Sequence, residues 1–239
     1  MKKIVLYFIR KIKALLIRYK IHLLIDPFSG TLQNLVYISK LSKWVKKTPM
    51  PEFNDFYSKK RDYSKRYKLY EYVINKEKLD EIYYLEFGVA QGYSFKWWIE
   101  NIKNKKSRFI GFDTFSGLPE NWSALHKKGS MSASVPDIND KRCVFKVGLF
   151  QETLPEFLKE FNSNLRTIIH MDADIYSATL YVLTSLSRIL KKGDIIFFDE
   201  FNVPKHEFKA FTEFVDSYYV KYKVIGAVNN YYQIAIIIL

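Results

Sequence analysis

Residues 82–94 read IYYLEFGVAQGYS, and this stretch decides how the rest of the chain is interpreted. It starts as an apolar, aromatic run of strand length, passes through a turn with Gly88 and Gly92, and enters a predicted helix over residues 93–103. A glycine turn lets the backbone approach a ligand closely, and the helix start offers free N–H donors. The third glycine of the dinucleotide fingerprint is missing at its usual spacing, so a nicotinamide cofactor is not favoured.

Further strands and helices alternate along the rest of the chain. Strand-like runs are predicted at residues 108–113, 142–147, 166–172, 194–199, 221–226 and 232–239, and helices at 154–160, 177–190 and 208–219. This alternation predicts an α/β fold, a Rossmann-like sheet of seven strands whose last pair is antiparallel, with helices on both faces. Ligands of such sheets bind at the carboxyl ends of the strands.

Two acids flank the glycine turn. Glu86 precedes Gly88, and Asp113 ends the next strand, 27 residues later. An acid at each of these places suits a ligand that carries ribose hydroxyls and a positive charge. An ordinary turn with no ligand remains the alternative for the glycine pattern taken alone.

More acids gather after two later strands. Asp172 ends the strand at 166–172 and Asp174 follows it, and Asp199 ends the strand at 194–199 with Glu200 directly after it. Carboxylates at neighbouring strand ends repel one another unless they bind a cation or stay solvated. Ligands that are oxygen alone suit Mg²⁺ or Mn²⁺ rather than zinc. The alternative is a solvated loop in which Asp174 or Ser177 caps the following helix.

Five stretches in this order resemble the macrocin O-methyltransferase family. They are residues 85–94, 111–122, 148–155, 170–179 and 197–201, and the resemblance covers about residues 66–239. The family consists of class I enzymes that depend on S-adenosylmethionine (SAM), and its relatives methylate sugar hydroxyls of macrolide and aminocoumarin antibiotics. The resemblance therefore implies a class I methyltransferase fold and SAM as cofactor.

The resemblance also implies roles for particular residues. It places Asp174 as the general base, Asp172, Asp199 and Glu200 as ligands of Mg²⁺ (or Mn²⁺), and Gln151-Glu152 near the adenine of SAM. The SAM-binding residues that it implies are Glu86, Gly88, Gly92, Ser94, Asp113, Thr114, Gln151 and Glu152. Better-known members carry two aspartates where this chain has Asp199-Glu200. Residues 117–139 form either a lid over the substrate or a disordered surface loop, and both interpretations stay open.

The expected reaction is Mg²⁺-assisted methyl transfer from SAM to a sugar hydroxyl. The acceptor would be a sugar or glycoconjugate: a surface polysaccharide, a lipid-linked glycan or a glycosylated metabolite. Two alternatives remain, a nucleic-acid methyltransferase and a non-catalytic, membrane-associated scaffold. Base N-methylation typically uses an Asn/Asp-Pro-Pro-Tyr/Phe type motif where this chain has Asp172-Ala173-Asp174, so nucleic acid is the less favoured partner.

The positive charge is concentrated at the N-terminus. The 239 residues include 38 basic and 25 acidic ones, a net charge of +13; residues 1–50 hold eleven basic residues and one acid, which gives +10. Residues 51–239 then hold 27 basic and 24 acidic residues, which gives +3. We therefore divide the chain into a basic amphipathic helical extension, residues 1–65, and a second part, residues 66–239, which the resemblance implies is a SAM-dependent methyltransferase domain.

Residues 3–24 predict an amphipathic helix whose apolar residues recur at steps of three and four. Its longest uncharged run, residues 4–9, is much shorter than the roughly 20 residues of a spanning helix. Three interpretations stay open: residues 1–25 lie on an anionic membrane, they pack on the protein's own body or on a second subunit in a homo-oligomer, or they bind nucleic acid. Asp26-Pro27 and Ser29-Gly30 are expected to end this helix, and residues 32–44 to form a second one.

The single cysteine, Cys143, excludes an intramolecular disulfide and a multi-cysteine metal site. No signal-type cleavage site is recognisable after the N-terminus. We therefore expect folding in a reducing compartment, the cytoplasm, with the chain peripheral on the inner face of the cell membrane if the N-terminal helix binds lipid.

Overall fold

The predicted strand at 82–87 lies inside an eight-stranded sheet of order β1-β7-β8-β6-β5-β2-β3-β4. This computed structural model describes residues 2–122 and 125–239. The strands are β1 (Phe53–Asn54), β2 (Ile82–Phe87), β3 (Arg108–Asp113), β4 (Cys143–Val147), β5 (Arg166–Met171), β6 (Ile195–Phe198), β7 (Tyr222–Val228) and β8 (Gln233–Ile238).

The strand directions confirm the Rossmann-like α/β architecture. Strands β2 to β6 pair in parallel, whereas β8 runs antiparallel to both of its neighbours, β6 and β7. The sheet has one strand more than the seven expected, because Phe53–Asn54 pairs in parallel with β7. A two-residue strand has no periodicity of its own, so it is specified by the pairing with β7 and not by a local pattern.

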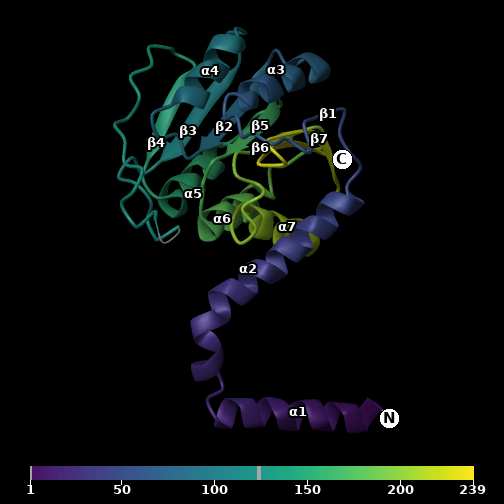
Figure 1. The fold of residues 1–239 in the computed structure, drawn as a ribbon. Helices are drawn as coiled ribbons and strands as arrows, with labels where there is room; N and C mark the ends of the chain where they lie inside the picture. The colour runs from purple at the N-terminus through teal and green to yellow at the C-terminus, as the bar shows by residue number, and fades with distance from the viewer. Residues whose placement is uncertain (1, 123–124) are drawn as a thin grey trace.

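Helices cover both faces of this sheet, as Figure 1 shows. Helices α3 and α4 pack on one face, around Tyr70 and Trp98, and α5, α6 and α7 pack on the other, around Phe157, Leu183 and Phe211. The helices are α1 (Lys2–Arg18), α2 (His22–Lys47), α3 (Lys65–Glu77), α4 (Tyr93–Asn101), α5 (Phe150–Glu160), α6 (Tyr176–Leu186) and α7 (Glu207–Tyr218). Because the central strands are covered on both sides, they are continuous apolar runs instead of alternating ones.

The order of the strands fixes where a ligand can bind. The chain builds outward from β2 through β3 to β4, then returns to the other side of β2 and continues from β5 to β6. A crevice therefore opens beyond the carboxyl ends of β2 and β5, where the direction of winding changes.

The N-terminal helices differ from the expectation in where they break. The chain turns at Tyr19 to Ile21, where Lys20 has φ 51°, and α2 then runs unbroken from His22 to Lys47. The prediction that Asp26-Pro27 and Ser29-Gly30 end the helix is wrong. Pro27 lies near the start of α2 and removes a single backbone hydrogen bond there, and a glycine inside a helix costs only about 1 kcal/mol.

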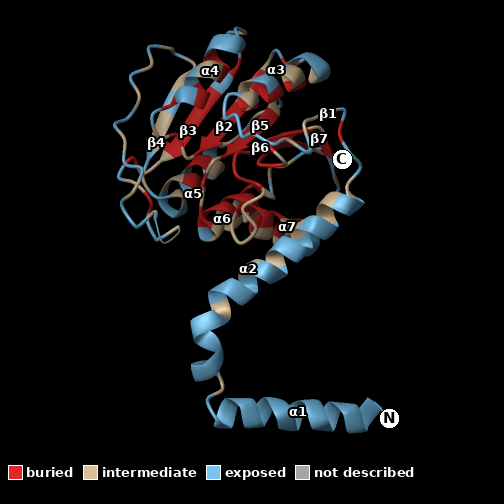
Figure 2. Ribbon diagram, in the orientation of Figure 1, coloured by how far each residue is buried: buried red, intermediate tan, exposed pale blue. Residues whose placement is uncertain are grey.

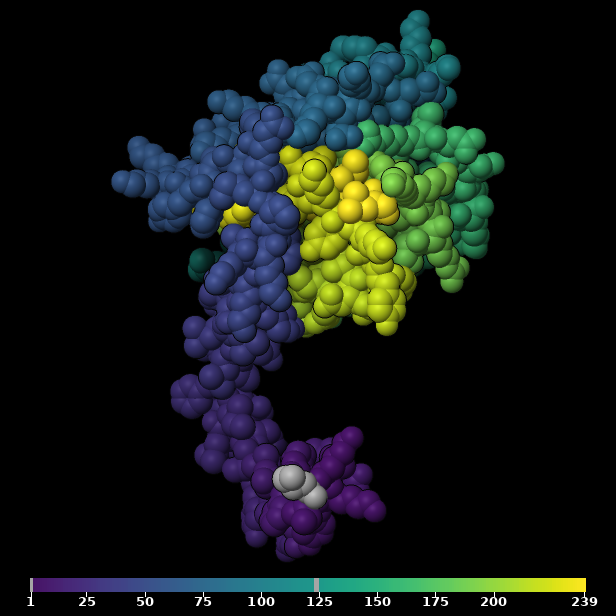
Figure 3. Space-filling view, turned by 90° about the vertical axis from the view of Figure 1, so that its right-hand side faces the viewer, coloured from purple at the N-terminus to yellow at the C-terminus, as the bar shows by residue number. Residues whose placement is uncertain are grey.

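The N-terminal extension contacts the body through only part of its length. Tyr37, Leu41, Trp44 and Val45 pack against the core beside α7, and the Trp44 indole Nε1 donates a 2.8 Å hydrogen bond to the Tyr222 hydroxyl. Helix α1 buries no residue, so it does not pack on the protein's own body. Figure 2 shows α1 and the first half of α2 as exposed, and Figure 3 shows them standing clear of the body. Within the described residues, no helix has the length and apolar character needed to cross a membrane.

Candidate active site

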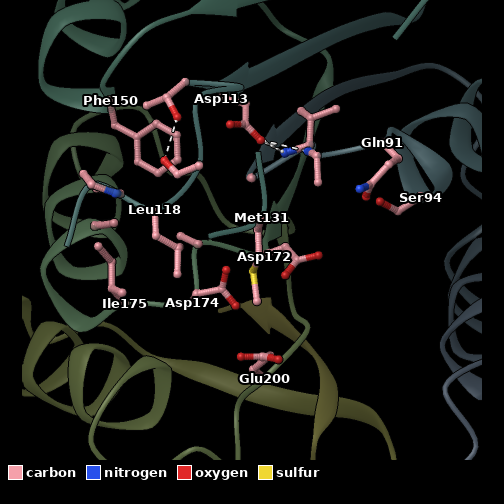
Figure 4. Close-up of a pocket in the computed structure, with 18 of the residues that line it drawn as sticks. Gln91, Ser94, Asp113, Leu118, Met131, Phe150, Asp172, Asp174, Ile175 and Glu200 are labelled. Atoms are coloured by element: carbon pink, nitrogen blue, oxygen red, sulfur yellow. Dashed lines mark hydrogen bonds between the residues drawn. The ribbon is translucent and has the colours of Figure 1, made fainter. Parts of the chain in front are cut away.

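A cavity of about 370 Å³ opens at the carboxyl ends of the central strands. Residues from the turn after β2, the end of β3 and the segments after β5 and β6 line it together (Figure 4). This is the crevice that the strand order predicts. Among the predicted site residues, the lining includes Gly88, Ser94, Asp113, Thr114, Gln151, Asp172, Asp174 and Glu200.

The glycine turn needs its glycines for backbone geometry. Gly88 has φ +90°, and a Cβ placed there would lie 1.9 Å from the backbone oxygen of Asp172. Gly92 has φ +75° and forms the residue before α4, with Pro136 in the way of any Cβ. Gly88 therefore allows the ends of β2 and β5 to approach each other closely, and Gly92 shapes the chain where it enters α4.

Asp113 fixes the conformation of this turn. Its Oδ2 accepts hydrogen bonds of 2.8 Å from the backbone N–H groups of both Val89 and Ala90, and its Oδ1 accepts one of 2.7 Å from Phe115 N–H. Thr114 beside it donates from Oγ1 to the Gly117 carbonyl. The carboxyl predicted to bind the ribose thus lies in the cavity lining and is also part of the turn that shapes it.

Glu86 and Ser94 lie one behind the other. The Ser94 hydroxyl lines the cavity and donates a 2.6 Å hydrogen bond to Glu86 Oε1, while the Tyr84 hydroxyl donates to Oε2 at 2.5 Å. Glu86 is fully buried and lies outside the lining. The structure thus places Ser94, and not Glu86, at the cavity surface.

Apolar residues and the start of α5 form the opposite wall. Helix α5 begins at Phe150, earlier than expected, so Gln151 lies in its first turn and in the lining. Glu152 does not line this cavity; its Oε2 accepts a 3.1 Å hydrogen bond from Leu149 N–H. Leu118, Pro119, Met131, Leu149, Phe150 and Ile175 give this wall its apolar character. Residues 117–119 and 131 of the segment 117–139 thus line the cavity, and residues 123–124 of that segment lie outside the described residues.

Three carboxyl groups meet at the inner end of the cavity: those of Asp172, Asp174 and Glu200, shown in Figure 4. Burial raises the pKa of Asp174 from 3.8 to about 6. Burial and the charge of Asp174 raise the pKa of Glu200 from 4.5 to about 8. For Asp172, burial and the charge of Asp199 raise the pKa well above its usual value. The interaction of these two carboxyl groups lowers the pKa of Asp174 and raises the pKa of Glu200, so Glu200 is the member of the pair that holds a proton.

Asp199 is fully buried beneath these groups. Its Oδ2 accepts a hydrogen bond from the Tyr63 hydroxyl and lies 3.5 Å from Arg66 Nη1. Both Tyr63 and Arg66 also line the cavity, and sequence reasoning missed them. No motif marks them, because they lie far in sequence from the strand ends. They reach the site because α3 and the segment before it pack on the sheet.

Two further residues that sequence reasoning missed support Glu200. The Tyr232 hydroxyl donates a hydrogen bond to Glu200 Oε1, and Glu207 Oε2 accepts a 2.9 Å hydrogen bond from Glu200 N–H. Tyr232 comes from β8, and Glu207 begins α7. Tyr232 therefore holds the side chain of Glu200, and Glu207 holds its backbone.

His170 has a structural environment. It is fully buried, and its two ring nitrogens lie 3.0 Å from the hydroxyls of Tyr70 and Tyr84. Its ring lies on the α3 and α4 side of the sheet, away from the cavity lining. His170 is therefore a structural residue and is not placed to act as the general base.

The acids do not form a ready metal site as they stand. Over residues 2–122 and 125–239, no group of three or more His, Cys, Asp or Glu side chains is arranged to hold a metal ion. Two buried oxygens beside the cavity, Asp199 Oδ1 and Glu200 Oε2, nevertheless have no hydrogen-bond partner. Unpartnered carboxylate oxygens are the kind of donor that Mg²⁺ binds, so the residues fit such an ion chemically.

Comparisons with known proteins agree with this fold. Residues 85–201 match the family described as "Methyltransferase domain", a span that runs from the end of β2 to just past β6. Together, the sheet order, the glycine turn and this match define a class I, SAM-dependent methyltransferase.

Solved structures of two named enzymes have the same fold. CalS11, a calicheamicin methyltransferase, superposes with a TM-score of 0.59 at 20% identity, covering 86% of this chain and 92% of that one. The O-methyltransferase NovP superposes with a TM-score of 0.54 at 17% identity, covering 86% and 97%. Curated protein sequences give no significant match to the chain. At these identities the likeness concerns the fold.

Proposed function

We propose that this enzyme transfers the methyl group of SAM to a hydroxyl of a sugar, with Asp174 as general base and with help from Mg²⁺. The observation that carries the proposal is the meeting of three carboxyl groups, those of Asp172, Asp174 and Glu200, in the cavity that the glycine turn also lines. The proposed acceptor classes are a surface polysaccharide, a lipid-linked glycan and a glycosylated metabolite.

Asp174 suits the role of base because of its surroundings. Its pKa of about 6 makes the ionised form a better proton acceptor than an ordinary aspartate, while leaving it ionised near neutral pH. Its backbone has φ 57°, a left-handed conformation that is costly for a residue other than glycine. This conformation supports a role that depends on where the Asp174 side chain points.

An alcohol is too weak an acid for a free carboxylate to deprotonate at neutral pH. Mg²⁺ held by Asp172, Asp199 and Glu200 would supply a Lewis acid that lowers the pKa of the acceptor hydroxyl. Tyr63 and Arg66 leave Asp199 Oδ1 unpartnered, and Tyr232 leaves Glu200 Oε2 unpartnered, so each acid keeps one oxygen for an ion. The other residues of the cavity hold the acceptor and SAM in line for the transfer.

The solved structures add support from related folds. CalS11 is described as a TDP-rhamnose 3'-O-methyltransferase in calicheamicin biosynthesis, and its second structure superposes with a TM-score of 0.53 at 18% identity. NovP is described as an O-methyltransferase. A sugar hydroxyl is therefore the acceptor favoured here.

The test is methyl transfer by the purified chain from labelled SAM to a panel of sugar nucleotides and glycans, with Mg²⁺ or with EDTA. We expect transfer to a sugar, a loss of rate with EDTA, and at least about a hundredfold loss of kcat in Asp174→Asn with SAM affinity kept. Asp216→Asn, an exposed acid on α7, is the matched control. Full turnover by Asp174→Asn would exclude it as the base, a rate unchanged by EDTA would exclude the metal, and transfer to nucleic acid alone would exclude the sugar.

A further inference from the structure

Helix α1 presents an apolar surface that no other part of the chain covers. None of its residues is buried; Phe8 is 57% exposed and Ile12 55%. In Figures 1 and 3, α1 lies at the far end of α2, away from the sheet and its helices. A soluble monomer gains nothing from a helix with a bare apolar side, so this surface indicates a binding partner.

The apolar residues of α1 form one continuous arc. At 3.6 residues per turn, seven apolar side chains fall side by side with no charged residue among them. They are Ile4, Val5, Phe8, Ile9, Ile12, Leu15 and Leu16. Lys2 and Lys13 border one edge of the arc, and Lys11 and Arg18 border the other. Long basic side chains at both edges of an apolar arc can extend to lipid headgroups while the arc faces the acyl chains.

The charge of α1 selects the kind of partner. The helix contains Lys2, Lys3, Arg10, Lys11, Lys13 and Arg18 and no acidic residue. Two copies of this helix packed together would bring their cations close with no carboxylate to pair them. Nucleic acid would pair the cations but leave the apolar arc in water. An anionic lipid surface satisfies both the cations and the arc.

We propose that α1 lies in the plane of an anionic phospholipid bilayer and holds the methyltransferase body at the membrane surface. Its apolar arc faces the acyl chains, and the basic residues at its edges contact the headgroups. Helix α2 then connects the membrane to the body through the contacts of Trp44. This inference is independent of the proposed acceptor, and the failure of either leaves the other intact.

Flotation of the full chain with phospholipid vesicles tests the proposal. The probes are phosphatidylcholine vesicles with and without phosphatidylglycerol, at low and high salt. We expect the chain to float with the anionic vesicles, to stay at the bottom with the neutral ones, and to be released as salt rises.

Two double variants, each of which loses two apolar side chains, test which face of α1 contacts the membrane. Phe8→Gln with Ile12→Gln changes the arc, whereas Leu6→Gln with Ile17→Gln changes two apolar residues among the basic ones outside it. We expect at least about a tenfold loss of vesicle affinity in the first and less than about threefold in the second. Neither pair contacts the body, so SAM binding should be unchanged in both and serves as the check on folding.

Each contrary result overturns the proposal. Equal flotation with neutral vesicles would show that an anionic surface is not required. Equal losses of vesicle affinity in the two double variants would show that the apolar arc is not the face that meets the membrane. A dimer in solution that the arc variant dissociates, with no flotation, would assign the arc to a second copy of the chain. Retention on duplex DNA without flotation would assign the cations to nucleic acid.

Discussion

Replacing Glu200 with glutamine should change how stability depends on pH. Its folded-state pKa of about 8 lies above its usual 4.5, so between these values the folded chain holds a proton that the unfolded chain has lost. The stabilisation is complete below about pH 4.5 and disappears as pH rises through 8. At about 1.4 kcal/mol per pKa unit, the titration of Glu200 alone should lower the free energy of unfolding of the metal-free protein by about 2 kcal/mol between pH 6 and pH 8.

The assay is thermal unfolding in EDTA at a series of pH values. A loss of about 2 kcal/mol corresponds to a Tm lower by roughly 4–8 °C for a domain of this size. The glutamine of Glu200→Gln does not titrate, so most of the decrease in Tm between pH 6 and pH 8 should be absent in this variant. Glu156→Gln, an exposed glutamate on α5, should keep it. A wild-type Tm that stays flat or rises from pH 6 to pH 8, or an equal decrease in Glu200→Gln, would refute the reasoning.

Three further substitutions test the glycine turn and the core. Gly88→Ala should weaken SAM binding by at least about tenfold, because its Cβ would lie 1.9 Å from the Asp172 backbone oxygen at φ +90°. Calorimetric titration measures the SAM affinity. An unchanged affinity would contradict the close approach of Gly88 to Asp172. Asp113→Ala leaves three backbone N–H groups without their acceptor. It should also lower SAM affinity by about tenfold or more in the same titration. A change within about twofold would contradict the role of Asp113 in shaping the turn. Trp98→Ala empties a fully buried site between Tyr84 and Phe197, and should reduce the free energy of unfolding by about 3–5 kcal/mol in a urea titration, with less than about 1 kcal/mol arguing against a packed core there.

The sheet could be predicted from sequence because its strands carry strong local signals. The runs predicted at 82–87 and 108–113 have the bounds of β2 and β3. Each is apolar almost throughout because helices cover both faces of the sheet, and each ends in a turn or an acid. The same logic predicted that Asp172, Asp174 and Glu200 would meet, since the ends of neighbouring parallel strands lie at one edge.

The parts that could not be predicted depend on contacts distant in sequence. Tyr63 and Arg66 reach Asp199 across more than 130 residues of chain, through the packing of α3 and the segment before it. That segment contains β1, which exists only because β7 offers an edge. At Pro27 the sequence predicted a helix end that the structure does not have. The local helix-breaking effect of this proline was weaker than the helical preference of the residues around it.

The raised pKa values bear directly on the proposed Mg²⁺. Burial and neighbouring carboxylates raise the pKa of Asp172 and of Glu200, and Arg66 is paired with Asp199 beneath them. Their mutual repulsion can be relieved in two ways, by protonation or by a bound cation, and each works against the other. If Mg²⁺ binds Asp172, Asp199 and Glu200, binding must release the proton that Glu200 holds, so affinity should rise with pH up to about 8. The pH range in which the metal-free chain becomes less stable is therefore the range over which its affinity for the ion would rise.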